Sequence, residues 1–182
     1  MTGPTLVVVD MQQVFGDPAS PWFTPKFAVA EAAIAGMLPA FGANVVFTRF
    51  IAPEKPEGAW VPYYEQWPFA LVPEDDPLYD LVLAFRDTGH PVVTEPTFGK
   101  WGNSLRDALA GSQDVVLAGV STDCCVLSTA LGAADAGVRI RVAADACAGL
   151  SDADHQRALD AMALYAPLIE ITDSAGVLDG LR

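Results

Sequence analysis

Positive charge is scarce in this sequence. Its 182 residues contain 10 Lys and Arg against 23 Asp and Glu, which gives a formal net charge of −13 at pH 7. Nucleic-acid phosphates and anionic lipid headgroups are bound by clustered Lys and Arg. We therefore expect neither nucleic acid nor a membrane surface as a partner, and the excess of acid serves solubility.

Cysteine, histidine and long apolar runs are also scarce. Three cysteines, two of them adjacent, make a poor disulfide framework and favour a reducing cytoplasm. Two scattered histidines, His90 and His155, match no zinc pattern, so we expect no metal. No uncharged apolar run reaches the roughly 18 residues of a membrane span. Residues 1–4 lack the basic start of a signal peptide, which again favours the cytoplasm.

Apolar residues are plentiful, at 52%, and they fall into alternating strand-like and helix-like segments. Short apolar runs predict strands at 5–9, 44–48, 91–94, 114–118, 138–143 and 168–171. Segments of helical character lie at 28–41, 78–86, 102–110, 123–136 and 152–165. This alternation predicts an α/β fold with three layers (α/β/α) around a mostly parallel, six-stranded, Rossmann-like sheet. Because no repeat or linker divides the chain, we expect residues 1–182 to form a single domain.

The segment 51–77 interrupts this alternation. It carries many prolines and aromatic residues with little periodicity, and such a long insertion in a compact domain is usually a lid or a binding loop. Two interpretations stay open for its aromatic residues and for those of the loop after the first strand. They either pack on the core or a subunit interface, or form a wall around a flat substrate. The residues concerned are Trp60, Tyr63, Tyr64, Trp67, Phe15 and Trp22. We expect a homo-oligomer, and we expect Phe15 and Trp60 to contact a substrate.

Three reactive side chains follow predicted strands. Asp10 ends the first strand, Lys100 lies in the loop after the third, and Cys125 follows the fourth at a helix start. Ligands of parallel sheets bind at the carboxyl ends of the strands. A helix start and a nearby ammonium lower the pKa of a thiol, and free helix N–H groups can hold an oxyanion. A carboxylate can take the thiol proton and return it to a leaving amine. The pattern predicts a cysteine nucleophile.

Two segments carry a family resemblance. Residues 119–126 read GVSTDCCV, which resembles the G-x-x-T-D-x-C-V signature of isochorismatase-like cysteine hydrolases, a family that includes nicotinamidases and N-carbamoylsarcosine amidase. Residues 7–12 read VVVDMQ and are similar to the opening strand of that family, with its catalytic Asp and following Gln. Further matches at 129–130 and 145–147 extend the resemblance over nearly the whole chain.

The resemblance implies an amidohydrolase with Asp10, Lys100 and Cys125 as its catalytic residues. It implies that the N–H groups of Ser121 and Cys125 hold the oxyanion, the former through a cis Val120–Ser121 peptide. The expected reaction cleaves a C–N bond of a small amide, ureido or carbamoyl compound through a thioester, without a cofactor. Gln12 and Trp101 are further expected substrate contacts. Cys124 fills a variable position, and we expect it to be a bystander.

The chain departs from the family pattern at the lysine. The family lysine ends the third strand, where this chain has Glu95, and Lys100 comes five residues later. The long lysine stem can reach back if the loop folds inward, which Gly99 and Gly102 would permit. We expect Lys100 to complete the site. The alternatives are that Glu95 has changed the site or that Lys100 is a surface charge.

A second departure follows the second strand. Residues 48–51 read TRFI, with no histidine nearby, so a nicotinamidase-type metal site is not expected and nicotinamide is disfavoured as substrate. Arg49 is either half of a surface ion pair or a fork for carboxylate or ureido oxygens of the substrate. We count it among the expected substrate contacts.

Other functions and roles stay open. A nucleotide-binding protein is disfavoured because residues 10–13 contain no glycine-rich phosphate turn. A pseudo-enzyme or binding module without turnover would explain the displaced lysine. Asp123 is expected to cap its helix, and Cys147 to be a small buried hydrophobe.

Overall fold

A single parallel sheet forms the centre of the molecule. The computed structural model describes residues 3–182. Six strands lie in the order β3-β2-β1-β4-β5-β6, and every neighbouring pair is parallel. The strands are β1 (Thr5–Val9), β2 (Val45–Phe50), β3 (Val92–Glu95), β4 (Asp114–Val120), β5 (Arg139–Ala148) and β6 (Ile169–Thr172). This is the doubly wound order of Rossmann-type sheets.

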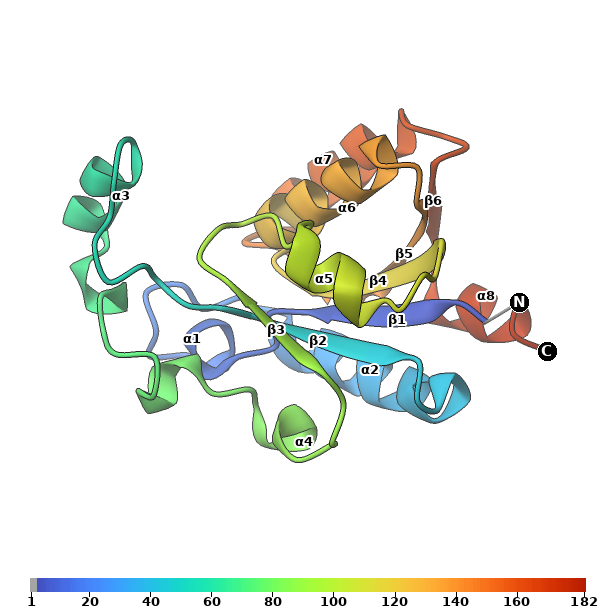
Figure 1. Ribbon diagram of the computed structural model, residues 1–182, viewed down its shortest axis with the longest axis horizontal. Helices are drawn as coiled ribbons and strands as arrows, with labels where there is room; N and C mark the ends of the chain where they lie inside the picture. The colour runs from blue at the N-terminus through green and yellow to red at the C-terminus, as the bar shows by residue number, and fades with distance from the viewer. Residues whose placement is uncertain (1–2) are drawn as a thin grey trace.

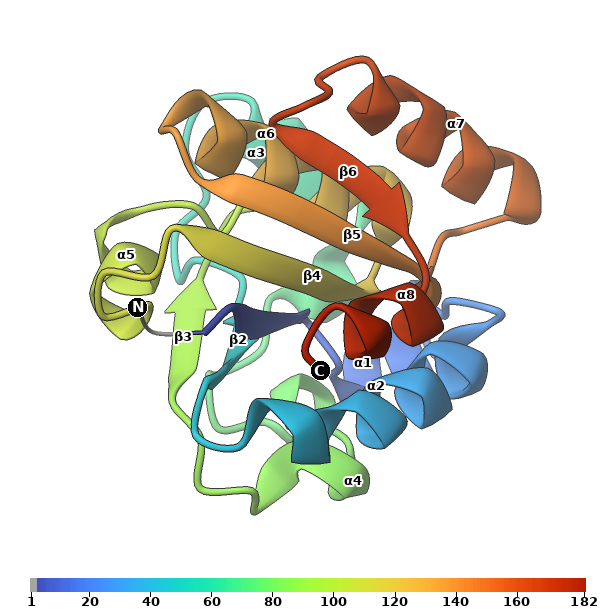
Figure 2. The ribbon, with the colours of Figure 1, turned by 90° about the vertical axis from the view of Figure 1, so that its right-hand side faces the viewer.

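Helices cover both faces of the sheet and make the outer layers (Figures 1 and 2). One face carries α1 (Gln13–Gly16), α2 (Phe27–Phe41), α4 (Leu83–Arg86) and α8 (Ser174–Asp179). The other carries α5 (Asn103–Ala108), α6 (Leu127–Asp135) and α7 (Asp152–Ala163). The three-layer α/β/α prediction is confirmed. No helix within residues 3–182 is both long enough and apolar enough to span a bilayer.

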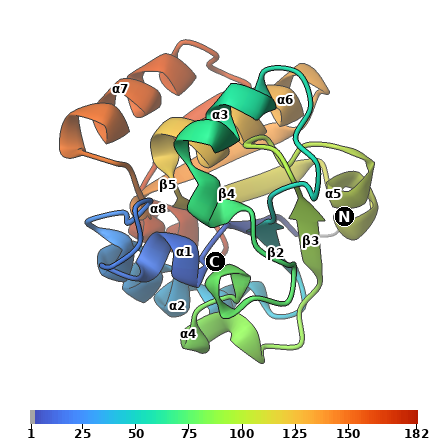
Figure 3. The same ribbon diagram turned by 90° about the vertical axis from the view of Figure 1, so that its left-hand side faces the viewer.

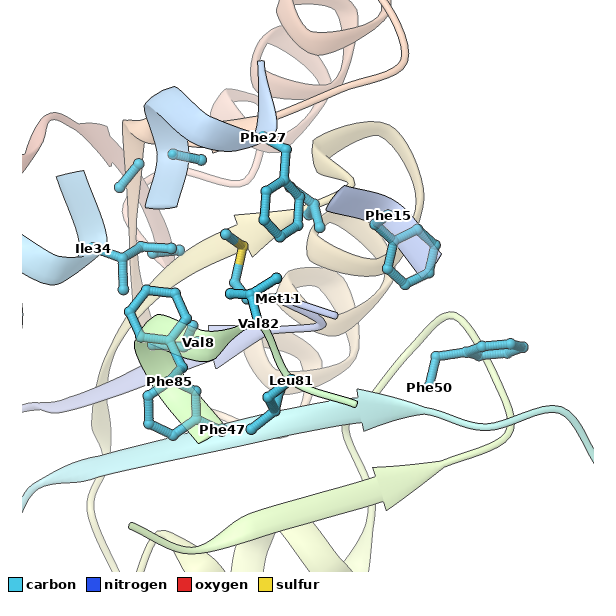
Figure 4. Close-up of a cluster of buried hydrophobic side chains, with 14 of the residues drawn as sticks. Val8, Met11, Phe15, Phe27, Ile34, Phe47, Phe50, Leu81, Val82 and Phe85 are labelled. Carbon is cyan, nitrogen blue, oxygen red and sulfur yellow. The ribbon is translucent and has the colours of Figure 1, made fainter. Parts of the chain in front are cut away.

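The central strand β1 belongs to two cores. Leu6 and Val8 pack under the α2 layer, whereas Val7 and Val9 pack under the α6 layer, and none of the four is exposed. Successive side chains of a strand point to opposite faces, so a strand covered on both sides needs a continuous apolar run. Each such side chain contributes roughly 1.5–3 kcal/mol through burial. Figure 4 shows the first core, with labelled members Met11, Phe27, Ile34, Phe47 and Phe85.

The main differences from the predicted elements concern β5, the helix predicted at 78–86 and α8. β5 extends to Ala148 because its last residues pair with the end of β4 after a register shift. The predicted helix 78–86 is divided into a 3₁₀ turn, η2 (Pro77–Tyr79), and α4, because Leu81 makes an isolated antiparallel bridge with Gln12. The helix α8 was not predicted, and Asp173 caps it by accepting a hydrogen bond from Gly176 N at 2.7 Å.

The aromatic insertion lies over the carboxyl ends of the strands. It contains α3 (Trp60–Gln66) and a 3₁₀ turn, η1 (Pro68–Ala70). Figure 3 looks toward this end of the sheet, with α1 and α3 in the foreground. The insertion is therefore more regular than predicted and lies where ligands of such sheets bind.

The strands β1 and β4 approach each other very closely at this end. Val9 pairs with Gly119, whose φ is +118°. A Cβ at position 119 would lie 2.1 Å from Val9 O, which excludes every other residue type. The chain leaves β1 and β4 in opposite directions here, so Asp10 and residues 121–125 follow neighbouring strands at the point where the strand order reverses.

Candidate active site

A buried ion pair joins the loop after β3 to the end of β1. Lys100 Nζ lies 3.0 Å from Asp10 Oδ2, and neither side chain is exposed. The ammonium also donates to Thr97 O at 2.7 Å, and Lys100 N donates to Thr129 Oγ1 at 2.9 Å. These bonds hold the lysine loop folded inward. Lys100 therefore supplies the cation beside Asp10, and Glu95 has not taken its place there.

Thr48 of β2 holds the Asp10 carboxylate in place. Its hydroxyl donates to Asp10 Oδ1 at 2.6 Å and accepts from Asp10 N at 3.2 Å, and Thr48 is fully buried. The φ of Asp10 is +49°, in the left-handed region. Oδ2 lies 3.0 Å from the ammonium but accepts no well-aligned hydrogen bond. Thr48 is the polar last residue of the strand predicted at 44–48, so the rule that selects Asp10 would also have selected it.

Replacing Thr48 by valine should misplace this carboxylate. The change keeps the side-chain shape but leaves Asp10 N without its acceptor and Oδ1 without its donor. We expect kcat to fall between about 10- and 100-fold with KM nearly unchanged, and the free energy of unfolding to fall by about 1–3 kcal/mol. Steady-state kinetics and urea denaturation measure both quantities. Thr48→Ser retains the hydroxyl and should restore most of kcat, whereas equal losses in the two variants would contradict the role.

Cys125 lies beside this ion pair in a π-helical turn, η3 (Thr122–Val126). It is 3% exposed, and its main-chain carbonyl accepts from Thr129 Oγ1 at 2.7 Å. Burial raises the pKa of the Cys125 thiol well above its usual range, the charge of Asp10 raises it further, and Lys100 opposes them. Lys100 lowers this pKa as expected, but burial and the charge of Asp10 outweigh it, so the net shift is opposite to the expected one. The resting side chain is a neutral thiol, so its attack on a carbonyl needs a base.

The turn that carries Cys125 is held from several sides. The Val120–Ser121 peptide before it is cis, as the resemblance implies. Thr122 Oγ1 lies 2.8 Å from Nδ1 of His155 on α7, and burial lowers the pKa of this histidine. Asp123 does not cap a helix as expected. Its Oδ1 accepts from Leu150 N at 3.1 Å, which ties η3 to the loop after β5.

A cavity of about 300 Å³ opens onto the thiol. Phe15 lines it as expected, together with Ser121 and Cys125. Figure 4 shows Phe15 and Phe50 at one end of the apolar cluster, near the carboxyl ends of the strands. The other lining residues are Pro21, Trp22, Thr24, Phe50, Tyr63, Trp67, Phe98, Asp123, Cys124 and Leu150. Cys124, expected to be a bystander, thus borders the cavity.

Gln12 and Arg49 do not line the cavity, contrary to expectation. Gln12 is fully buried; its amide donates to Phe50 O and Tyr79 O at 2.9 and 2.8 Å and accepts from Phe50 N at 2.7 Å. The main chain thus occupies both amide hydrogens. Arg49 pairs with Glu74 at 3.2 Å, which agrees with the surface ion pair and not with a substrate fork.

Trp60 and Trp101 also lie outside the cavity lining. Trp60 packs against two residues that line the cavity, with its ring centroid 5.2 Å from those of both Tyr63 and Phe98. Trp101 lies in the α5–α6 region, where its ring lies 5.6 Å from the guanidinium carbon of Arg106. Sequence position located both residues near the site but could not give the direction of their rings.

Neither Cys147 nor the acidic residues within the described part of the chain indicate a second reactive site or a metal site. Burial raises the pKa of Cys147 to about 12, and this side chain is 6% exposed, as expected of a small buried hydrophobe. Within the part of the chain that the structure describes, no three His, Cys, Asp or Glu side chains form a group suited to a metal ion.

Residues 4–175 match the family model described as the Isochorismatase domain. The fold is similar to a cysteine hydrolase from Pseudomonas syringae pv. phaseolicola, with a TM-score of 0.86 and 21% identity over 98% of this chain and 92% of that chain. It is also similar to a pyrazinamidase/nicotinamidase from Streptococcus mutans, with a TM-score of 0.74 and 23% identity over 93% of this chain and 100% of that chain. N-carbamoylsarcosine amidase from Thermoplasma acidophilum has a TM-score of 0.74 and 22% identity over 94% of this chain and 96% of that chain. These identities establish a likeness of fold. A comparison with curated proteins finds no significant match.

Proposed function

The chain belongs to the isochorismatase domain family, and from this membership and the site geometry we propose that it is a cysteine hydrolase of small amide, ureido or carbamoyl compounds. Its family places it among the isochorismatase-like hydrolases. The observation that carries the proposal is the buried Asp10–Lys100 pair beside a cavity-facing thiol. Two of the structural neighbours are amidases by name, which supports cleavage of a C–N bond.

In the proposed first half-reaction, Cys125 attacks the substrate carbonyl. Asp10 takes the thiol proton as the C–S bond forms, and the N–H groups of Ser121 and Cys125 hold the oxyanion. Asp10 then gives the proton to the leaving nitrogen, the C–N bond breaks, and an amine or ammonia leaves a thioester behind. A positioned acid–base group contributes about 10²- to 10⁴-fold, and one oxyanion donor about 2.7–4 kcal/mol.

In the second half-reaction, water hydrolyses the thioester. Asp10 takes one proton from the water as its oxygen attacks the acyl carbon. The C–S bond breaks, and the proton returns to the sulfur of Cys125, which restores the neutral thiol. Lys100 touches no substrate atom in this scheme; its ammonium compensates the buried carboxylate and holds its position.

Trapping the thioester tests the proposal. The protein is incubated with small amides, quenched in acid and digested, and the peptides are weighed by mass spectrometry. We expect ammonia release and an acyl adduct on the peptide that contains Cys125. Because Cys124 lies on the same peptide, Cys124→Ser and Cys125→Ser form a matched pair. The adduct should persist in the first and disappear in the second. Turnover without an adduct, or an adduct that needs Cys124, would refute the scheme.

A binding module without turnover was favoured by the displaced lysine alone. Since the Lys100 ammonium lies 3.0 Å from Asp10 Oδ2, the displacement leaves the ion pair intact and that support is gone. We also propose that the protein acts in the cytoplasm, which its three free cysteines support. The homo-oligomer and the single domain over residues 1–182 stay predictions.

A further inference from the structure

Trp22 joins three segments of the cavity wall. It lies in the loop between α1 and α2, and its ring stacks on Phe15 at 6.2 Å with an interplanar angle of 10°. Its ring also lies 4.9 Å, edge-on, from Phe69 of the insertion. Further ring centroids lie within 6.1 Å of it, those of Phe50, Tyr63 and Trp67. Aromatic pairs at such distances stabilise one another beyond the burial of their apolar area.

The cavity lining holds no cationic side chain, among the residues that the structure describes, to pair with a carboxylate on the substrate. Among the described residues that line it, Asp123 is the only carboxylate, and none is a Lys or Arg. Three described cations close in sequence to lining residues pair with carboxylates. Lys100 pairs with Asp10, Arg49 with Glu74, and Lys26 with Asp152 at 2.6 Å. Because the whole chain carries −13, its field also opposes the approach of an anion.

The cavity is small and has few polar groups. Its volume of about 300 Å³ lies at the lower end of the roughly 300–1,000 Å³ of ligand sites. Its hydroxyl residues are Thr24, which is 2% exposed, Ser121 and Tyr63, and Asp123 is its one charged side chain among the described residues. A ring-sized group fits such a space, whereas a branched polar substrate would leave polar atoms without partners.

We propose that this cavity selects an amide whose acyl group is flat, uncharged and of the size of one aromatic ring, and that Trp22 is the residue that sets the selectivity. This inference rests on the proposed function and narrows its substrate class. The ring lies against the Trp22–Phe15 wall, and its carbonyl reaches the thiol. Acyl groups bearing a carboxylate are rejected because no cation pairs with them and Asp123 repels them.

Three matched amides test the class. Benzamide is flat and neutral, cyclohexanecarboxamide is neutral but not flat, and 4-carbamoylbenzoate adds a carboxylate to the same ring. Ammonia release gives kcat/KM, and titration calorimetry with Cys125→Ser gives Kd without turnover. We expect benzamide to exceed 4-carbamoylbenzoate on the order of 100-fold, and cyclohexanecarboxamide about tenfold. An equal or reversed order in Kd would overturn the inference.

Variants of Trp22 test whether this residue sets the preference for a flat acyl group. In Trp22→Ala the ratio of benzamide to cyclohexanecarboxamide affinity should fall about tenfold, whereas Trp22→Phe should keep most of it. Trp101→Phe, which changes a tryptophan outside the cavity, should leave the ratio unchanged. An unchanged ratio in Trp22→Ala, with a native circular dichroism spectrum, would overturn the role of Trp22.

A positive charge introduced at the edge of the cavity tests the rejection of carboxylates and leaves Trp22 and Phe15 unchanged. Leu150 lines the cavity but is 61% exposed, so Leu150→Lys should fold, and it should improve Kd for 4-carbamoylbenzoate at least about tenfold. Leu164→Lys, at a leucine that is 85% exposed and outside the cavity lining, is the control. No gain in Leu150→Lys would contradict the electrostatic argument.

The two proposals fail separately. If Cys125→Ser binds benzamide selectively but the wild-type protein neither releases ammonia nor forms an acyl adduct, the hydrolase function fails and the binding inference stands. If the wild-type protein hydrolyses 4-carbamoylbenzoate better than benzamide, the inference fails and the function stands.

Discussion

Lys100→Met is expected to lower the free energy of unfolding by about 3–5 kcal/mol and to abolish measurable turnover. Methionine has a similar length but no charge, so the Asp10 carboxylate stays buried without the cation that it pairs with. Both partners are completely buried, so water cannot replace the lost ammonium without local opening. The carboxylate then either takes up a proton, and no longer accepts one from the thiol, or opens the site to solvent. Urea denaturation followed by circular dichroism measures the first effect, and ammonia release the second.

A double-mutant cycle isolates the ion pair. Asp10→Asn/Lys100→Met removes both charges, so it should recover much of the stability lost in Lys100→Met while staying inactive. Lys55→Met is the matched control, because Lys55 is exposed and should change stability by less than about 0.5 kcal/mol. A loss below about 1 kcal/mol in Lys100→Met would show that the pair does not carry the stability assigned to it.

Cys125→Ser should reduce kcat by about 10⁴-fold or more while the protein stays folded. The change replaces one atom, so packing is nearly preserved. A serine hydroxyl is far less acidic than a thiol, and Asp10 cannot deprotonate it at useful rates. Ammonia release by the purified variants, with the melting temperature as a check on folding, measures the effect.

The control for this variant is Cys147→Ala. Cys147 lies outside the cavity lining, and its raised pKa keeps it inert, so its replacement should leave kcat within about twofold of the wild-type value. Turnover that persists in Cys125→Ser would remove the proposed nucleophile. Equal losses in the two variants would point to a general defect of folding.

The pattern of β-branched residues predicted the fold well. Residues 5–9 form one buried strand because a run of four apolar residues cannot face water on either side. The end of β5 was missed because residues 144–148 contain three alanines and no β-branched residue. There the pairing with β4 decides the conformation, which local propensity does not record.

The site was predicted less completely than the fold. The strand-end rule located Asp10 and Cys125, and the structure brings Lys100 to the former. The inward course of the lysine loop depends on Thr97 O and Thr129 Oγ1, two contacts that no sequence pattern encodes. The catalytic roles themselves stay predictions.

Side-chain direction separates two of the expected substrate contacts from the cavity lining. The direction of Gln12 follows from its bonds to the main chain at Phe50 and Tyr79, and that of Arg49 from its pairing with Glu74. In each case the residue was near the site in sequence, and a contact across the fold turned its polar group elsewhere.

The pairing of β1 with β4 means that the two halves of the proposed chemistry come from distant parts of the chain. During synthesis the carboxylate emerges from the ribosome early, whereas the sulfur follows only after the whole insertion, β3 and β4 have been made. A nascent or truncated polypeptide that stops before β4 therefore contains no attacking group at all. Hydrolytic activity therefore indicates that β4 has paired with β1 in the middle of the sheet.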